Sequence, residues 1–185
     1  MSGYSPRRRL EMTYNTLPNT GDDRLNEQKN LPTLIAELSD PDKAVRAKAM
    51  RGLVTLGGPA VPACIPLLQD GDWKVRYRAA EALGLIGDGK AYAPLIAALG
   101  DGKDHVRYMA AKGLGLLGDP RAAAHLKAVQ CDENEFVRRS AASSLGKIGG
   151  EEAVGALRAA LDGETTEGVR AAILAALRDA GADGR

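Results

Sequence analysis

Aromatic residues, cysteines and histidines are scarce in this chain of 185 residues. Only 4% of the residues are aromatic although 44% are hydrophobic, so a core must consist mainly of aliphatic side chains. The two cysteines, Cys64 and Cys131, and the two histidines, His105 and His125, show no spacing typical of a metal site or a redox pair. We therefore expect neither a metal nor another cofactor.

The chain also lacks long apolar runs and a strong excess of one charge. No run approaches the roughly 20 apolar residues that span a bilayer, and the N-terminus has no apolar secretory segment. The net charge is +1, which removes the bulk attraction behind most nucleic-acid binding. We expect a soluble, cytoplasmic protein with no membrane partner, for which nucleic acid is a disfavoured ligand.

A Val-Arg pair recurs five times between residue 31 and the end of the chain. The successive spacings are 30, 31, 31 and 32 residues. The pairs are Val45-Arg46, Val75-Arg76, Val106-Arg107, Val137-Arg138 and Val169-Arg170. A fixed period of this size is typical of stacked repeats, because one unit cannot bury its own apolar face and needs its neighbours.

Each copy contains two apolar runs, and the second run has helical periodicity. In the second copy, Val75, Ala79, Leu83 and Ile86 fall at i, i+4, i+8 and i+11, which is one face of an α-helix. A glycine closes this run in four copies, as expected at a helix C-terminus. The sequence therefore predicts two helices and two turns per copy.

An aspartate lies six residues before the arginine in four copies, and the second copy ends in the pattern A-x-x-x-L-G-x-I-G. These features resemble the HEAT repeat, in the short form named after the phycobilisome bilin lyases. The resemblance covers residues 31–185 and implies an all-α fold, a right-handed α-solenoid (superhelix) of five two-helix HEAT-like repeats. It also implies a ladder of turn carboxylates and helix arginines: Asp40, Arg46, Asp70, Arg76, Asp101, Arg107, Asp132, Arg138 and Arg170.

Two expectations follow for this ladder. Arg107 is expected to bridge the carboxylates of Asp101 and Asp70. In the last repeat an inserted residue leaves Glu164 or Asp162 as the acidic partner of Arg170.

Two glycine patterns imitate nucleotide-binding motifs. Residues 84–90 read GLIGDGK, but Ala91 stands where Ser or Thr would hold magnesium, and a predicted helix precedes the motif instead of a strand. Residues 113–118 read GLGLLG inside a predicted helix. We interpret these glycines as small residues that allow close packing of helices.

Four of the seven aromatic residues fall on the side of the second helices that faces away from the core, at about 100° of rotation per residue. In HEAT-like solenoids this side lines the concave surface, and aromatics beside arginine are typical of binding hot spots. The predicted partner-binding residues are Trp73, Lys74, Tyr77, Glu81, Tyr108, Lys112, Phe136 and Arg139. The alternative is that these rings pack on adjacent repeats.

The first 30 residues belong to no repeat and form a polar N-terminal arm. The arm carries three consecutive arginines and spaced apolar residues, and we expect it to be disordered alone and ordered on a partner, or else a solvated tail. Its candidate anchors are Tyr4, Arg7, Arg8, Arg9, Leu10 and Tyr14. Residues 22–29 could form a short helix that caps the first repeat.

The predicted function is protein binding, as a scaffold, adaptor or assembly factor with no catalytic residues. At the C-terminal end, Ile173 and Leu174 replace residues that are mostly alanine in other copies, which allows self-association there. One alternative is a bilin lyase or lyase subunit, as the resemblance implies. A second is nucleic-acid binding through Lys43, Lys48, Arg51, Lys74, Arg78 and Lys112, although Glu37, Asp42, Asp72, Glu81 and Asp104 offset these cations.

Overall fold

The computed structural model describes residues 30–182, and all regular structure in this range is helical. The helices pair into five repeats, as predicted. The pairs are α2 (Leu31–Glu37) with α3 (Lys43–Leu56), α4 (Val61–Cys64) with α5 (Trp73–Ile86), α6 (Tyr92–Ala98) with α7 (Asp104–Leu117), α8 (Ala122–Val129) with α9 (Glu135–Ile148), and α10 (Gly150–Gly163) with α11 (Glu167–Asp179). Short 3-10 turns at Gly58–Ala60, Pro66–Gln69 and Gly89–Ala91 complete the early repeats.

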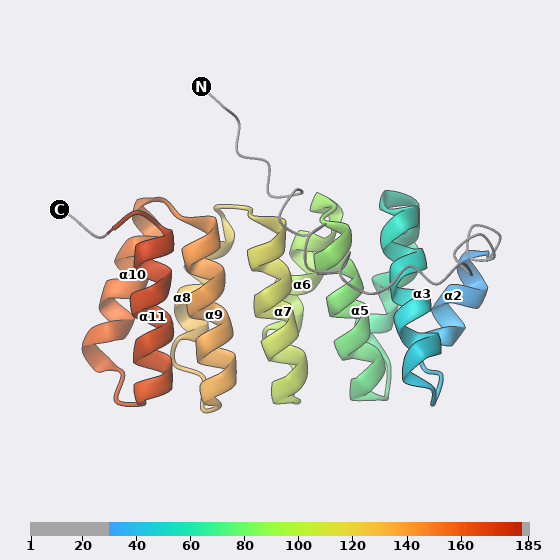
Figure 1. Ribbon diagram of the computed structural model, residues 1–185, viewed down its shortest axis with the longest axis horizontal. Helices are drawn as coiled ribbons and strands as arrows, with labels where there is room; N and C mark the ends of the chain where they lie inside the picture. The colour runs from blue at the N-terminus through green and yellow to red at the C-terminus, as the bar shows by residue number, and fades with distance from the viewer. Residues whose placement is uncertain (1–29, 183–185) are drawn as a thin grey trace, which may run out of the picture.

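The second helix of each repeat stands beside the second helix of the next, in chain order, so that α3, α5, α7, α9 and α11 form one layer (Figure 1). Helices α6, α8 and α10 form the layer behind them. This is an α-solenoid of five two-helix repeats, which confirms the predicted fold class. The predicted arm, including its anchors and the capping helix at 22–29, lies outside the described residues.

Polar caps and glycines set the limits of the second helices. The side chains of Asp42, Asp72 and Asn134 accept hydrogen bonds from backbone N–H groups in the first turns of α3, α5 and α9. Gly87 and Gly118 end α5 and α7 with φ of 71° and 68°, in the left-handed region that favours glycine.

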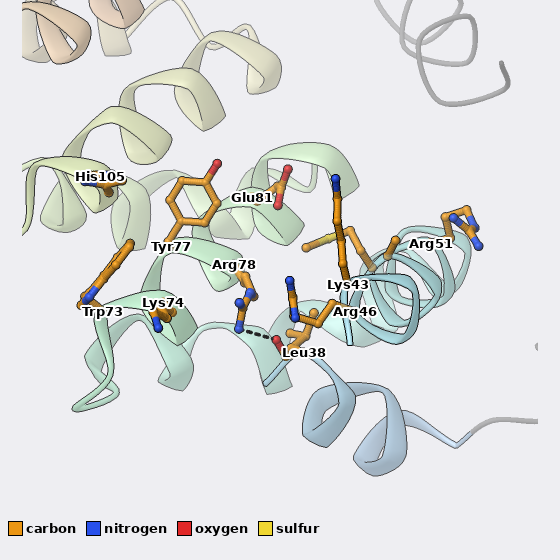
Figure 2. A pocket seen from close by; sticks show the side chains of 12 residues that line it. Leu38, Lys43, Arg46, Arg51, Trp73, Lys74, Tyr77, Arg78, Glu81 and His105 are labelled. Atoms are coloured by element: carbon orange, nitrogen blue, oxygen red, sulfur yellow. Dashed lines mark hydrogen bonds between the residues drawn. The ribbon is translucent and has the colours of Figure 1, made fainter. Parts of the chain in front are cut away.

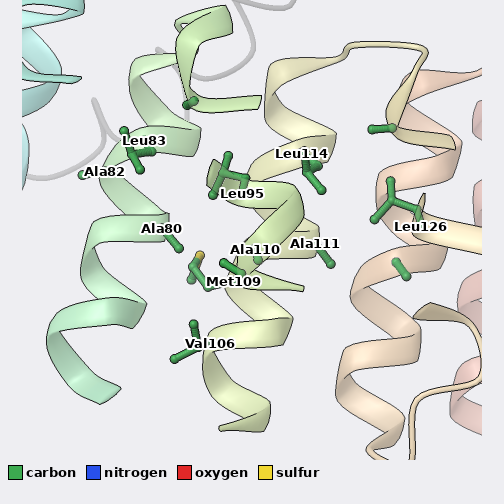
Figure 3. Packing of buried hydrophobic residues seen from close by; sticks show 14 of the residues in the cluster. Ala80, Ala82, Leu83, Leu95, Val106, Met109, Ala110, Ala111, Leu114 and Leu126 are labelled. Atoms are coloured by element: carbon green, nitrogen blue, oxygen red, sulfur yellow. The ribbon is translucent and has the colours of Figure 1, made fainter. Parts of the chain in front are cut away.

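The core between the two layers is aliphatic, as the composition predicts. Leu95, Met109, Leu114 and Leu126 are almost completely buried among alanines of α5, α7 and α9 (Figure 3). Cys64 is also buried, and burial raises the pKa of its thiol to about 11.

Glycines bring neighbouring second helices into close contact. A Cβ added to Gly84 of α5 would lie 2.6 Å from the Cα of Gly113 in α7, and a Cβ on Gly146 would lie 2.8 Å from the Cα of Ala176. Gly115 meets Ser144 in the same way. Gly84, Gly113 and Gly115 of the two glycine patterns are therefore helix-packing positions inside α5 and α7, as interpreted from the sequence, whereas Gly87 and Gly118 end these helices.

The arginine ladder joins each repeat to the one that follows it. The Nε of Arg107 donates to the carboxylate of Asp132 at 2.7 Å, and its Nη1 donates to the backbone carbonyl of Asp101 at 3.0 Å. Arg76 binds Asp101, and Arg138 binds Glu164, with the same geometry.

The prediction that Arg107 bridges the carboxylates of Asp101 and Asp70 is therefore wrong, because the carboxylate that Arg107 binds is that of Asp132. Each turn carboxylate also accepts the N–H two residues later in its own turn, as Asp101 does from Lys103. The carboxylate thus points toward the preceding repeat, and only its backbone carbonyl faces the arginine six residues later.

Within residues 30–182, the two ends of the ladder have no such carboxylate. Arg46 donates only to the backbone carbonyls of Asp40 and Pro41 among the described residues. Arg170 donates to the carbonyls of Leu161 and Glu164, so Glu164 and not Asp162 is the turn residue of the last repeat.

Candidate functional site

The candidate site is the face formed by the first half of α3, α5, α7 and α9, which we call the second-helix face. The predicted aromatics lie on it but differ in exposure. Phe136 is 56% exposed, whereas Trp73, Tyr77 and Tyr108 are half-buried and pack against the core. The three half-buried rings therefore pack against the core and keep an exposed edge, and their role in partner binding stays a prediction.

A first hollow, of about 260 Å³, joins α5, α7 and α9. Its lining residues are Tyr77, Asp104, His105, Tyr108, Asn134 and Phe136. Asn134 donates to Asp104 at 2.6 Å, and the ring Nδ1 of His105 lies 2.8 Å from the other Asp104 oxygen. The hydrogen bond from His105 is the main cause that lowers the pKa of Asp104 to about 2, so this hollow keeps a negative charge.

A second hollow, of about 530 Å³, lies between α3 and α5, and we call it the α3–α5 groove. Its lining residues are Leu38, Lys43, Arg46, Ala47, Met50, Arg51, Trp73, Lys74, Tyr77, Arg78, Glu81 and His105. Figure 2 shows Lys43 and Arg46 extending from α3, and Tyr77, Arg78 and Glu81 extending from α5, toward the space between the helices.

Tyr77 and His105 line both hollows, and next to His105 lies Trp73, which lines the α3–α5 groove. Its ring centroid is 4.9 Å from that of His105, and the ammonium of Lys103 lies 5.4 Å from the ring centroid. The aromatic surface is therefore flanked by cations, as is common at binding hot spots.

The structure brings together six of the eight predicted partner-binding residues. Trp73, Lys74, Tyr77 and Glu81 line the α3–α5 groove, and Tyr108 and Phe136 line the smaller hollow. Lys112 lines neither hollow. Arg139 also lines neither, and its guanidinium lies 5.9 Å from the ring centroid of Phe136.

Sequence reasoning missed the polar residues of the smaller hollow and the groove itself. Asn134 was detectable only as the residue before a helix, which indicates a cap and not a surface position. One feature of the sequence does set the first repeat apart: α3 carries Val54 at the position that holds glycine in α5, α7 and α9.

Within residues 30–182, no three His, Cys, Asp or Glu side chains cluster as metal ligands would. No single helix of that range is long and apolar enough to cross a membrane. One bent pair, Lys43–Leu56 with Gly58–Gln69 at 113°, reaches the required length and composition together.

The fold and this face define an α-solenoid with two adjoining hollows on its second-helix face. The sequence matches the family of HEAT repeats over residues 31–108, 61–130 and 93–178. The chain belongs to the HEAT repeat family.

Several solved structures share this architecture. The complex of CpcE and CpcF of phycocyanin lyase from Nostoc sp. PCC7120 is 28% identical, with a TM-score of 0.72 over 79% of this chain and 96% of that chain. Human deoxyhypusine hydroxylase in complex with glycerol is 23% identical, with a TM-score of 0.59 over 96% and 75% of the two chains. A designed armadillo repeat protein in complex with the peptide (KR)4 is 20% identical, with a TM-score of 0.60 over 94% and 90%.

The two less similar structures support the fold alone. A comparison with curated protein sequences finds no match.

Proposed function

We propose that this protein is a scaffold, adaptor or assembly factor that binds another protein on its second-helix face. The observation that carries the proposal is the row of aromatic side chains Trp73, Tyr77, Tyr108 and Phe136, which lines two adjoining hollows, the larger of which also carries cations. Exposed aromatics beside cations, rimmed by polar groups, are typical of protein interfaces.

The comparisons support a protein partner. The phycocyanin lyase structure is a complex of two proteins. Stacked repeats suit this role, because adjacent units create an extended surface on which a partner can lie.

Photo-cross-linking in native extract tests the proposal. A benzophenone amino acid is placed at Phe136, which is 56% exposed on the second-helix face, or at Arg158, which is exposed on α10 in the other layer. We expect a discrete protein adduct from position 136 and none from position 158. Equal adduct patterns at the two positions would remove the support for a specific face.

A second candidate function is that of a bilin lyase subunit, and the 28% identity to the CpcE–CpcF complex favours it. The sequence resemblance implies the same ligand class, a tetrapyrrole. Titration of the protein with a bilin, followed by its visible absorption spectrum, distinguishes the candidates. A saturable spectral change would favour the lyase-like role, and an unchanged spectrum would leave the scaffold.

A further inference from the structure

The α3–α5 groove lies at the interface where the first repeat departs from two packing rules that the later repeats follow. Gly84, Gly115 and Gly146 each let a second helix approach the next one closely. Val54 occupies the equivalent position of α3, and α3 packs far less extensively on α5 than the other second helices pack on their neighbours. A valine side chain prevents the approach that a glycine permits.

The second broken rule concerns charge. At three interfaces the helix arginine meets a carboxylate of the following repeat: Asp101, Asp132 or Glu164. At the first interface the equivalent carboxylate, that of Asp70, accepts the N–H of Asp72 but forms no ion pair with Arg46 among the described residues.

A second guanidinium stands at the base of the groove instead. Arg78 of α5 donates to the carbonyl of Leu38 at 2.7 Å (Figure 2). Burial, followed by the positive charge of Arg46, lowers the pKa of Arg78, which shows that the two cations act on each other. Neither guanidinium forms an ion pair with a carboxylate in residues 30–182.

The lining of the groove carries one sign of charge in excess. Lys43, Arg46, Arg51, Lys74 and Arg78 line it, and Glu81 is the single carboxylate among its lining residues. The neighbouring carboxylates of Asp42 and Asp72 accept backbone N–H groups as helix caps. The mixed charge that the sequence predicts for this region therefore leaves five cations and one carboxylate in the lining of the groove.

Apolar side chains complete the groove. Leu38, Ala47 and Met50 come from the first repeat, and the rings of Trp73 and Tyr77 come from the second. A ligand that fits must therefore carry a carboxylate and an apolar group on adjacent units.

We propose that the α3–α5 groove binds an acidic segment of a partner protein in extended form, with one carboxylate between Arg46 and Arg78 and adjacent apolar side chains against Met50, Trp73 and Tyr77. The carboxylate takes the place that Asp101, Asp132 and Glu164 hold at the later interfaces. This inference rests on the proposed protein-binding function and specifies the chemistry of the bound partner.

An acidic peptide fits better than a nucleic acid. The two guanidiniums lie at the base of the groove, half-buried, where a single side chain can reach them.

Trp73 is the only tryptophan of the chain, so its fluorescence reports on the groove alone. The full chain is titrated with an octapeptide of alternating glutamate and leucine, and separately with octapeptides in which glutamine or lysine replaces glutamate. We expect the glutamate peptide to bind and shift the Trp73 emission, with an affinity that falls as salt is added. The glutamine and lysine peptides are expected to bind at least about tenfold more weakly.

Three variants locate the bound carboxylate. Arg46→Gln should weaken binding about tenfold, and Lys43→Gln with Lys74→Gln, two exposed lysines on the groove rim, should weaken it by a smaller factor. Arg158→Gln, exposed on α10 in the other layer and outside the groove, should leave binding unchanged. The helical circular dichroism of each variant verifies that it is folded. If Arg46→Gln does not fold, the loss of peptide binding in the double lysine variant still tests the inference.

Four outcomes overturn the inference. Equal binding of the glutamine peptide would show that the groove recognises apolar side chains only. Binding of an oligothymidylate but not of the glutamate peptide would point to nucleic acid. If the glutamate peptide binds only after Asp22, Asp23 and Glu27 are replaced by neutral residues, the occupant of the groove is the chain's own N-terminal arm. If the protein forms a dimer that Arg46→Gln abolishes, the occupant is a second copy of the chain. None of these results affects the cross-link at position 136, so the proposed protein-binding function is tested independently of this inference.

Discussion

Arg107 of α7 donates two hydrogen bonds, of 2.7 and 2.9 Å, to the carboxylate of Asp132 in the following repeat. The two side chains are only 12% and 10% exposed, so water replaces neither partner easily. Arg107→Ala should lower the free energy of unfolding by about 1–3 kcal/mol, because Asp132 loses its charged donor. Urea denaturation measures this loss, and Arg139→Ala, an exposed arginine outside the ladder, serves as the control.

A double-mutant cycle identifies the true partner of Arg107. Arg107→Ala combined with Asp132→Ala should give a coupling energy of about 0.5–3 kcal/mol, because the two groups are in contact. The same cycle with Asp70→Ala should give a value near zero. Coupling to Asp70 as large as that to Asp132 would refute the observed direction of the ladder.

The helix contact at Gly84 predicts an unusual response to alanine. Alanine favours a helix over glycine by about 1 kcal/mol, but the added Cβ would lie 2.6 Å from the backbone of Gly113. Gly84→Ala should therefore destabilise the protein by about 1–3 kcal/mol through overpacking.

Gly155, in the middle of α10, is the matched control for that substitution. Nothing lies within 4 Å of a Cβ added there, so Gly155→Ala should stabilise the protein by up to about 1 kcal/mol. Thermal unfolding compares the two variants. Equal shifts of the same sign would show that the close approach of α5 and α7 does not limit the side chain at position 84.

The last link of the ladder predicts a pH dependence. The hydrogen bond from Arg138 is the main cause that lowers the pKa of Glu164 from 4.5 to about 2. A lowered pKa contributes stability above pH 4.5, and this contribution is lost as the pH falls through 4.5 toward 2. The melting temperature of the wild type should fall over that range more steeply than that of Glu164→Gln, which should be the less stable protein at pH 7. Parallel melting curves for the two proteins would exclude Glu164 as a contributor.

The solvent exposure of a side chain predicts whether it stabilises the fold or is available to bind a partner. Leu83→Ala should cost about 2–5 kcal/mol because it leaves a cavity in the core. Phe136→Ala should change the melting temperature little, since that ring is 56% exposed. Tyr108→Ala should fall between the two, because its half-buried ring packs against the core. A loss from Phe136→Ala as large as that from Leu83→Ala would place the ring in the core.

The sequence predicts the repeats well, because periodicity and helix-ending glycines are local signals. Gly84 and Gly146 could be interpreted as packing positions for the same reason. The ladder partner of Arg107 could not be predicted, since spacing along the chain does not say which neighbouring repeat a carboxylate points toward. That direction depends on the turn geometry, in which Asp101 also accepts the N–H of Lys103.

The α3–α5 groove was harder to predict, because it lies where the first repeat differs in sequence from the repeated pattern. Val54 differs from the glycine of later repeats by one side chain, and α3 packs less extensively on α5 than the later second helices pack on their neighbours. The half-burial of Tyr77 and Tyr108 also depends on how repeats stack, which helical periodicity alone does not give.

The most direct test of the account is the affinity of the partner captured by cross-linking at position 136. Its dissociation constant is measured for the wild type, for Phe136→Ala combined with Arg139→Ala, and for Arg158→Ala on the other layer. A protein-binding second-helix face predicts a loss of about tenfold or more for the double variant and an unchanged value for Arg158→Ala. Equal affinity for all three proteins would contradict the claim that the partner lies on this face.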